Sequence, residues 1–138
     1  ALNVALSSWQ VQERLGSPEG ELAIAQAVIY LACAPKSNAV YKAFNDARSV
    51  VQNGSSLEVP IHLRNPSNGL AVELNHGSGY RYSHDEEGNY SAGESYLPEA
   101  LKEGDFYKPT DNGLESEVKK KLDELKLRDA NSLQKRYL

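Results

Sequence analysis

The feature that most constrains this chain is a run of apolar residues from Leu22 to Ala34, which only Gln26 interrupts. The run is thirteen residues long. That is too short to cross a bilayer, because a spanning helix needs about 20 residues. A helix that is apolar on nearly every face is buried on all sides. We therefore expect a helix over about residues 18–34 that is either the central helix of its domain or partly covered by another subunit, and that Pro35 ends.

A first helix precedes this run and ends at Gly16. Ser17 and Pro18 then predict the N-cap and the first residue of the second helix. The first helix is recognised by apolar residues at helical spacing, which are Leu2, Ala5, Leu6 and Trp9.

A third helix is expected after a cap at Ser37 or Asn38, with a stop at Asn53 and Gly54. Its predicted buried stripe consists of Val40, Tyr41, Phe44, Ala47, Arg48 and Val51. Residues 57–63 alternate like a strand, but Pro60 makes an extended connector the better interpretation. A short fourth helix, capped by Asn65 with Pro66 in its first turn, is predicted to carry Leu70, Ala71 and Leu74.

Residues 76–112 lose the helical period and contain five glycines and two prolines. Six of the eleven aromatic residues lie in this segment, and each ring can bury about 150–250 Å². We expect these rings to hold an irregular segment against the helices. Residues 65–113 carry three basic and nine acidic side chains, so the segment is acidic. A last helix is expected from Leu114.

These patterns predict an all-α fold, a helical bundle with a long irregular Tyr/Gly-rich segment and a C-terminal helix. We expect a single domain made of a helical core over 1–75, an acidic wrap over 76–113 and the C-terminal helix over 114–138. The chain begins at Ala1 and has no methionine, which we interpret as a piece of a longer protein. The single cysteine excludes an internal disulfide framework and favours a reducing, cytoplasmic setting.

No pattern typical of an active site is found. Phosphate-binding loops and nucleophile elbows are absent from the sequence, and Cys33 is expected inside an apolar helix, where a thiol is inert. The chain offers His76, His84, Asp85 and Glu86 as metal-ligand types, but their spacing matches no known metal motif, so loop hydrogen bonds are the simpler interpretation. We expect no catalytic residue, no bound cofactor, no metal and no enzymatic activity in this chain.

Two kinds of interaction site are predicted instead. Apolar surface that one small domain cannot cover would join copies of the chain, and the candidate interface residues are Ile24, Val28, Tyr41 and Phe44, each of which could equally be core. Candidate DNA contacts are Arg81, Lys119, Lys120 and Lys121, because cations bind phosphates. The alternative is that the lysines form a solvated helix face.

The sequence also resembles a known family over nearly its whole length. The similar segments, in order, are the run from Pro18 to Phe44, Val59-Pro-Ile-His-Leu-Arg-Asn, Gly79-Tyr-Arg-Tyr-Ser-His-Asp, Tyr96-Leu-Pro and Phe106-Tyr-Lys-Pro-Thr, with a closing Asn131-Ser-Leu-Gln-Lys-Arg-Tyr. They resemble the C-terminal region of the MgsA/RarA family of replication-associated recombination AAA+ ATPases, which is related to the Werner helicase-interacting protein. The sequence departs from the family pattern at Pro66 to Val72.

The resemblance implies a domain like the collar of clamp loaders that assembles a homotetramer. It also implies an upstream AAA+ module that binds ATP and Mg²⁺, whose motifs are not in this chain. The parent proteins are DNA-dependent ATPases of DNA replication, recombination and repair at stalled forks. The implied partners are other copies of the chain, single-stranded DNA-binding protein and DNA, with no membrane, in the cytoplasm at the bacterial nucleoid.

Overall fold

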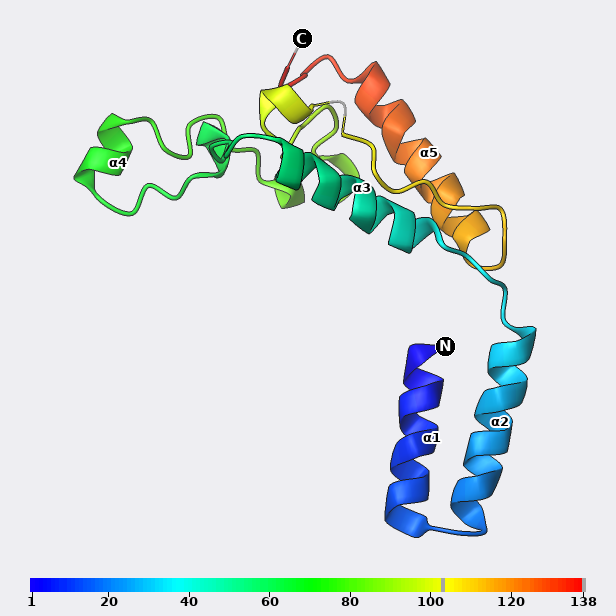
Figure 1. Cartoon of the computed structure of the whole chain (residues 1–138). Helices are drawn as coiled ribbons and strands as arrows, with labels where there is room; N and C mark the ends of the chain where they lie inside the picture. The colour runs from blue at the N-terminus through cyan, green and yellow to red at the C-terminus, as the bar shows by residue number, and fades with distance from the viewer. Residues whose placement is uncertain (103, 138) are drawn as a thin grey trace. The chain divides into compact units, whose positions relative to one another are not determined.

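The computed structural model describes residues 1–102 and 104–137, and over these residues the chain is helical without a strand. The α-helices are α1 (Leu2–Leu15), α2 (Glu19–Cys33), α3 (Ala39–Asn53), α4 (Gly69–Glu73) and α5 (Glu115–Asn131). Figure 1 shows their order along the chain. The predicted all-α class is confirmed.

The chain divides into two compact units, Ala1–Ser37 and Asn38–Leu138. The boundary falls inside the predicted 1–75 core. The predicted partition of the chain at residues 75 and 113 stays a prediction.

The first unit is a hairpin of α1 and α2. The two helices lie close together at Gly20, which is buried. A Cβ atom built there would lie 2.1 Å from Oε1 of Gln12 and 2.5 Å from its Cα atom. Glycine is therefore required for the contact, because any side chain would push the helices apart.

The turn of the hairpin corrects one prediction. Ser17 does not cap α2, because the helix begins at Glu19 with Pro18 in the N-cap position and no side-chain cap. The amide of Gly20 instead donates to the carbonyl of Gly16 over 2.7 Å, so a backbone hydrogen bond closes the turn.

In the second unit, α3 leads into an extended connector and a 3₁₀ turn at Ile61–Leu63. The predicted cap of the short fourth helix is wrong. The Oδ1 atom of Asn68, not of Asn65, accepts the amide of Ala71 at 2.8 Å, and α4 begins at Gly69. Asn68 occupies the N-cap position of α4, from which its side chain reaches the amide of Ala71. Asn65 lies too far upstream to accept that hydrogen bond.

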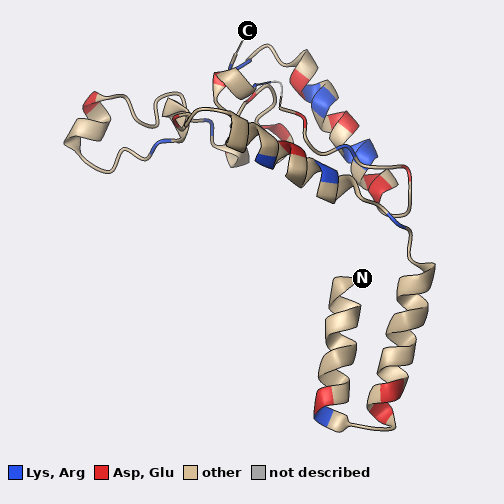
Figure 2. Cartoon of the chain, viewed as in Figure 1, with Lys and Arg blue, Asp and Glu red and all other residues tan. Residues whose placement is uncertain are grey.

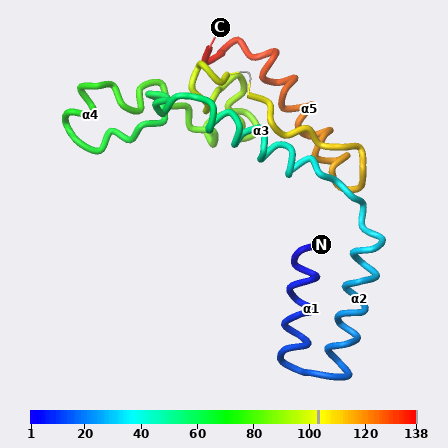
Figure 3. Tube along the Cα trace, in the orientation of Figure 1, coloured from blue at the N-terminus to red at the C-terminus, as the bar shows by residue number. Residues whose placement is uncertain are grey.

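The segment from His76 to Gly113 is irregular, as predicted, with 3₁₀ turns at Ser83–Asp85, Glu87–Asn89 and Glu99–Leu101. Figure 3 traces it as it folds back along α5. Its aromatic rings do less of the packing than expected, since Tyr80, Tyr82 and Tyr96 are all more than half exposed. Polar contacts to α5 hold it instead.

Asp129 of α5 makes the central polar contacts to this segment. Its Oδ2 atom accepts the hydroxyl of Tyr90 at 2.8 Å, and its Oδ1 atom accepts the amide of Gly93 at 2.9 Å. The guanidinium of Arg128 lies 5.0 Å from the centre of the Tyr90 ring. A cation over a ring is attracted to its face, so both Asp129 and Arg128 join α5 to the irregular segment.

The apolar core is small. Among the described residues, the buried apolar side chains are Ala27, Ala39 and Ala71. The predicted buried stripe of α3 is wrong for the single chain, because Tyr41 and Phe44 are 70% and 64% exposed. The helical periodicity of the sequence identified which residues of α3 share a face. It could not show that no other described segment of the chain covers that face.

The first prediction concerns the hairpin contact. Gly20→Val should lower the free energy of unfolding by about 1–3 kcal/mol, because the added side chain overlaps Gln12 and separates the helices. Urea denaturation followed by circular dichroism measures it. Gly69→Ala is the control, since nothing lies within 4 Å of the added atom, and it should be neutral or slightly stabilising. Equal stability of the wild type and the Gly20 variant would contradict the close contact.

Candidate interaction surfaces

The α1–α2 hairpin has an unusual distribution of charge. Its charged side chains are Glu13, Arg14, Glu19 and Glu21, all close to the turn, with Lys36 beyond the end of α2. Figure 2 shows the rest of both helices without Lys, Arg, Asp or Glu. Depletion of charge is typical of the buried centre of a protein interface.

The same helices expose large apolar side chains. On α2, Leu22 and Ile29 are 70% and 66% exposed. On α1, Trp9 is also mostly exposed, and it lines a hollow of about 380 Å³ beside Ile24. Gln12 lines this hollow too, and its buried Oε1 atom has no hydrogen-bond partner among the residues that the structure describes. An uncharged surface with this much exposed apolar area is typical of a contact site.

The four predicted interface residues are all exposed. Ile24 and Val28 lie on α2 in the first unit, whereas Tyr41 and Phe44 lie on α3 in the second. Each unit therefore exposes one pair of these apolar residues. The prediction that they contact another copy stays open.

Exposure of Cys33 corrects another prediction. Cys33 lies in the last turn of the apolar helix α2, as predicted. Its thiol is exposed, however, and not enclosed as expected.

Most of the predicted DNA contacts are already paired with carboxylates. Arg81 donates to Glu86 at 2.9 Å, Lys119 to Asp111 at 2.7 Å and Lys121 to Glu124 at 3.0 Å. The hydrogen bond from Arg81 holds the pKa of Glu86 below its usual range. Lys120 is exposed on α5. Arg81 thus lies in the irregular segment, and the three lysines lie on α5. Carboxylates neutralise most of the charge of these four side chains.

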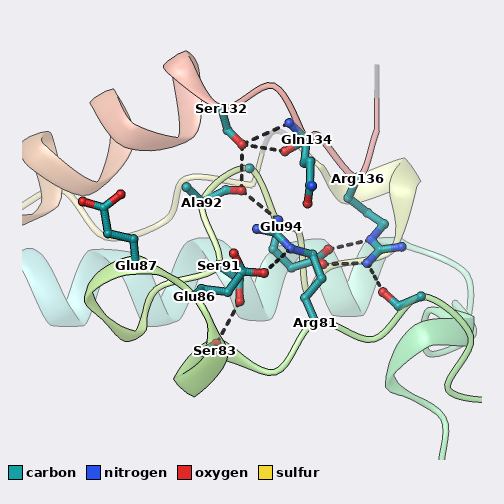
Figure 4. A network of polar contacts seen from close by, with 12 residues as sticks. Arg81, Ser83, Glu86, Glu87, Ser91, Ala92, Glu94, Ser132, Gln134 and Arg136 are labelled. Atoms are coloured by element: carbon teal, nitrogen blue, oxygen red, sulfur yellow. Dashed lines mark hydrogen bonds and ion pairs between the residues drawn. The ribbon is translucent and has the colours of Figure 1, made fainter.

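A polar cluster that the sequence did not reveal lies between the irregular segment and the C-terminal residues. The carboxylate of Glu94 is 2% exposed and accepts two hydrogen bonds of 2.6 Å from the guanidinium of Arg136. Arg136 also donates to the carbonyl of Gly79 at 2.7 Å. Figure 4 shows these bonds. Bidentate pairing of this kind fixes both side chains.

His62 completes the cluster. It is buried, and its Nε2 atom lies 3.6 Å from Glu94 and 3.1 Å from the carbonyl of Ser95. Burial raises the pKa of Glu94, but hydrogen bonds from Arg136 and from the amide of Ser95 outweigh it, so the pKa lies below the usual value. The cluster therefore joins the connector before α4, the irregular segment and the C-terminal residues.

Glu94 and Arg136 carry no sequence signal for this contact, because they are far apart in the chain and belong to no periodic pattern. His62 lies in one of the segments similar to the MgsA/RarA family, but that resemblance does not name its partner. The predicted metal-ligand types, His76, His84, Asp85 and Glu86, are not brought together. In the described part of the chain, no group of three His, Cys, Asp or Glu side chains is placed to hold a metal.

The second prediction tests the polar cluster. Arg136→Met should lower the free energy of unfolding by about 2–4 kcal/mol, because it leaves the buried Glu94 carboxylate without its cation. Lys121→Gln, which breaks an exposed ion pair, should cost less than about 1 kcal/mol. Denaturation at pH 7 measures both. A loss no larger for Arg136→Met than for the control would contradict the role of the cluster.

The third prediction is a pH dependence of the same cluster. The pKa of Glu94 is lower in the folded chain than its ordinary value of 4.5. Its contribution to stability is therefore complete above the unfolded pKa and is lost as the pH falls through the folded pKa. Wild type should lose more stability between pH 5 and about pH 3 than Glu94→Gln does, as denaturation at several pH values can show. Parallel pH profiles would contradict it.

No helix of the described residues is long and apolar enough to cross a membrane.

Comparison with known proteins supports the resemblance found in the sequence. The family described as MgsA AAA+ ATPase C terminal matches residues 1–126. The chain is 49% identical over 137 residues to replication-associated recombination protein A of Haemophilus influenzae, and 47% identical over 137 residues to that of Escherichia coli K12. These alignments cover 99% of this chain but 31% of each relative.

A more distant relative comes from a eukaryote. ATPase WRNIP1 of Dictyostelium discoideum is 33% identical over 107 residues, which are 78% of this chain and 12% of that protein. The chain thus spans about a third of the length of its bacterial relatives. By these matches, and by an all-helical structure without a strand in the described residues, the chain belongs to the C-terminal family of the MgsA AAA+ ATPases.

Proposed function

We propose that this chain is a non-catalytic self-association domain that assembles a homotetramer of a longer AAA+ ATPase. The observation that carries the proposal is the exposure of large apolar side chains on α2 and α3. Val28 of α2 is 60% exposed and Phe44 of α3 is 64% exposed. Water is a poor solvent for such faces, so a partner surface is needed to cover them.

The packing of the first unit supports the proposal. Ala1–Ser37 forms a compact unit of its own, and the buried residues of its helix α2 are Gly20 and Ala27. A protein surface that covers α2 would supply further apolar contacts.

In the parent protein, assembly would hold several ATPase modules together. Linked modules act at a high effective concentration and in a fixed geometry. The relatives are named replication-associated recombination proteins. We propose that the longer protein to which this chain belongs also acts on DNA in that process. ATP and Mg²⁺ would bind in the remaining two-thirds of such a protein, and the site of action would be the cytoplasm at the nucleoid.

Direct binding of DNA by this chain is the weaker candidate. Arg81, Lys119 and Lys121 already neutralise carboxylates, so they offer less charge to phosphate. Docking of single-stranded DNA-binding protein would be compatible with self-association, but no surface of the described residues favours it over another copy.

The fourth prediction is the mass of the chain in solution. Sedimentation equilibrium should give a species of four times the 15.2 kDa chain mass at micromolar concentration. Val28→Glu and Phe44→Glu should each weaken assembly by at least tenfold, because each places a charge on an apolar face. Lys121→Gln, which lies on neither face, is the control. A single 15.2 kDa species over a wide concentration range would contradict the proposal.

A further inference from the structure

We infer that α2 pairs with α2 of a second copy in an antiparallel, two-fold arrangement centred on Gln26. The inference rests on the proposed self-association and adds to it the surface, the orientation and the register. It depends on three features of α2: its exposed face, the position of its one polar residue and the distribution of charge.

The first feature is a continuous exposed face on the side of α2 away from α1. Gly20 and Ala27 are buried on the side toward α1. The opposite side carries exposed residues at the spacing of one helical stripe, which are Leu22, Ala25, Gln26, Ile29 and Cys33. A second copy is a suitable partner for this stripe, because an isologous contact needs only that a surface be complementary to itself.

The second feature is Gln26, which lies at the midpoint of α2 (Glu19–Cys33). A two-fold axis through the midpoint of a helix places that residue opposite itself in the other copy. A side-chain amide both donates and accepts hydrogen bonds, so two glutamines can pair with each other, whereas two carboxylates or two ammonium groups repel. One polar pair within an apolar contact specifies register and orientation.

The third feature is the charge at the two ends of the helix. Glu19 and Glu21 lie in the first turn of α2, and Lys36 follows its last turn. Antiparallel pairing brings the carboxylates of one copy toward Lys36 of the other, whereas parallel pairing would bring like charges together. Between these ends, residues 22–35 contain no charged side chain that would need to leave water.

The contact joins two copies as helices crossing at about 20°. A tetramer of dihedral symmetry needs a second isologous contact. The exposed face of α3, which carries Tyr41 and Phe44, is the surface available for it. Of the predicted interface residues, Tyr41 and Phe44 would then serve this second contact, whereas Ile24 and Val28 lie beside the exposed stripe of α2.

Disulfide formation in the full chain tests the register. Position 19 of one copy lies opposite Cys33 of the other in this arrangement, so Glu19→Cys should produce a covalent dimer under mild oxidation, visible on a non-reducing gel. Within one helix the two positions are about 21 Å apart, beyond the roughly 7 Å between Cα atoms that a disulfide tolerates. Peptide mapping should identify a bond between positions 19 and 33.

The controls are the two chains with a single cysteine. Wild type has Cys33 alone, and the double variant Glu19→Cys with Cys33→Ser has a cysteine at position 19 alone. Neither should form a crosslink, because position 33 of one copy is about 21 Å from position 33 of the other, and the same holds for position 19. Rapid crosslinking of wild type through Cys33 would overturn the antiparallel register. An oligomer in which Glu19→Cys fails to crosslink would also overturn it, while leaving self-association intact. A monomer in sedimentation would overturn both.

A second variant tests the role of Gln26. Gln26→Glu should weaken association by at least tenfold at pH 7, because two carboxylates would face each other, and acidification that protonates them should restore it. Gln10→Glu, at an exposed position of α1, should have no such effect. Equal association of the two variants would overturn the placement of Gln26 at the two-fold axis.

Discussion

The close approach of α1 and α2 at Gly20 is the constraint on which the rest of the account depends. It seats Gln12 against the backbone of α2 and so decides which side of that helix is covered. A pair of helices can cover only one side of each, so the remaining faces of an almost wholly apolar helix stay exposed. The exposed stripe from Leu22 to Cys33 is a direct consequence of this contact, and it is the physical reason for expecting assembly.

The second unit is held by different forces. Its buried apolar residues in the described range are Ala39 and Ala71, so polar pairs provide many of the contacts that hold this unit together. The buried carboxylate of Glu94 pairs with Arg136 and joins distant parts of the chain, while Asp129 binds the irregular segment to α5. Such pairs specify a geometry more than they add net stability. The acidic segment is thus ordered without the large aromatic core that its tyrosines suggested.

Much of the helical organisation could be predicted from the sequence, because periodicity and stop signals are local. Gly16 and Pro35 bound the hairpin helices as expected. The Asn68 cap was missed because Asn65-Pro66 matched the same local pattern three residues earlier. The Glu94–Arg136 pair could not be predicted, since no local pattern relates residues so far apart. Exposure of the α3 stripe was missed for another reason: periodicity identifies a common face but not what covers it.

The reactivity of Cys33 toward a thiol reagent, measured over a dilution series of the chain, tests the central claim most directly. Cys33 is the only cysteine and lies on the exposed stripe of α2. If another copy covers this stripe, the thiol should react slowly in concentrated samples. After dilution, it should react as fast as the thiol of the urea-unfolded chain. Fast reaction at every concentration would show that α2 stays open to solvent and would contradict the account.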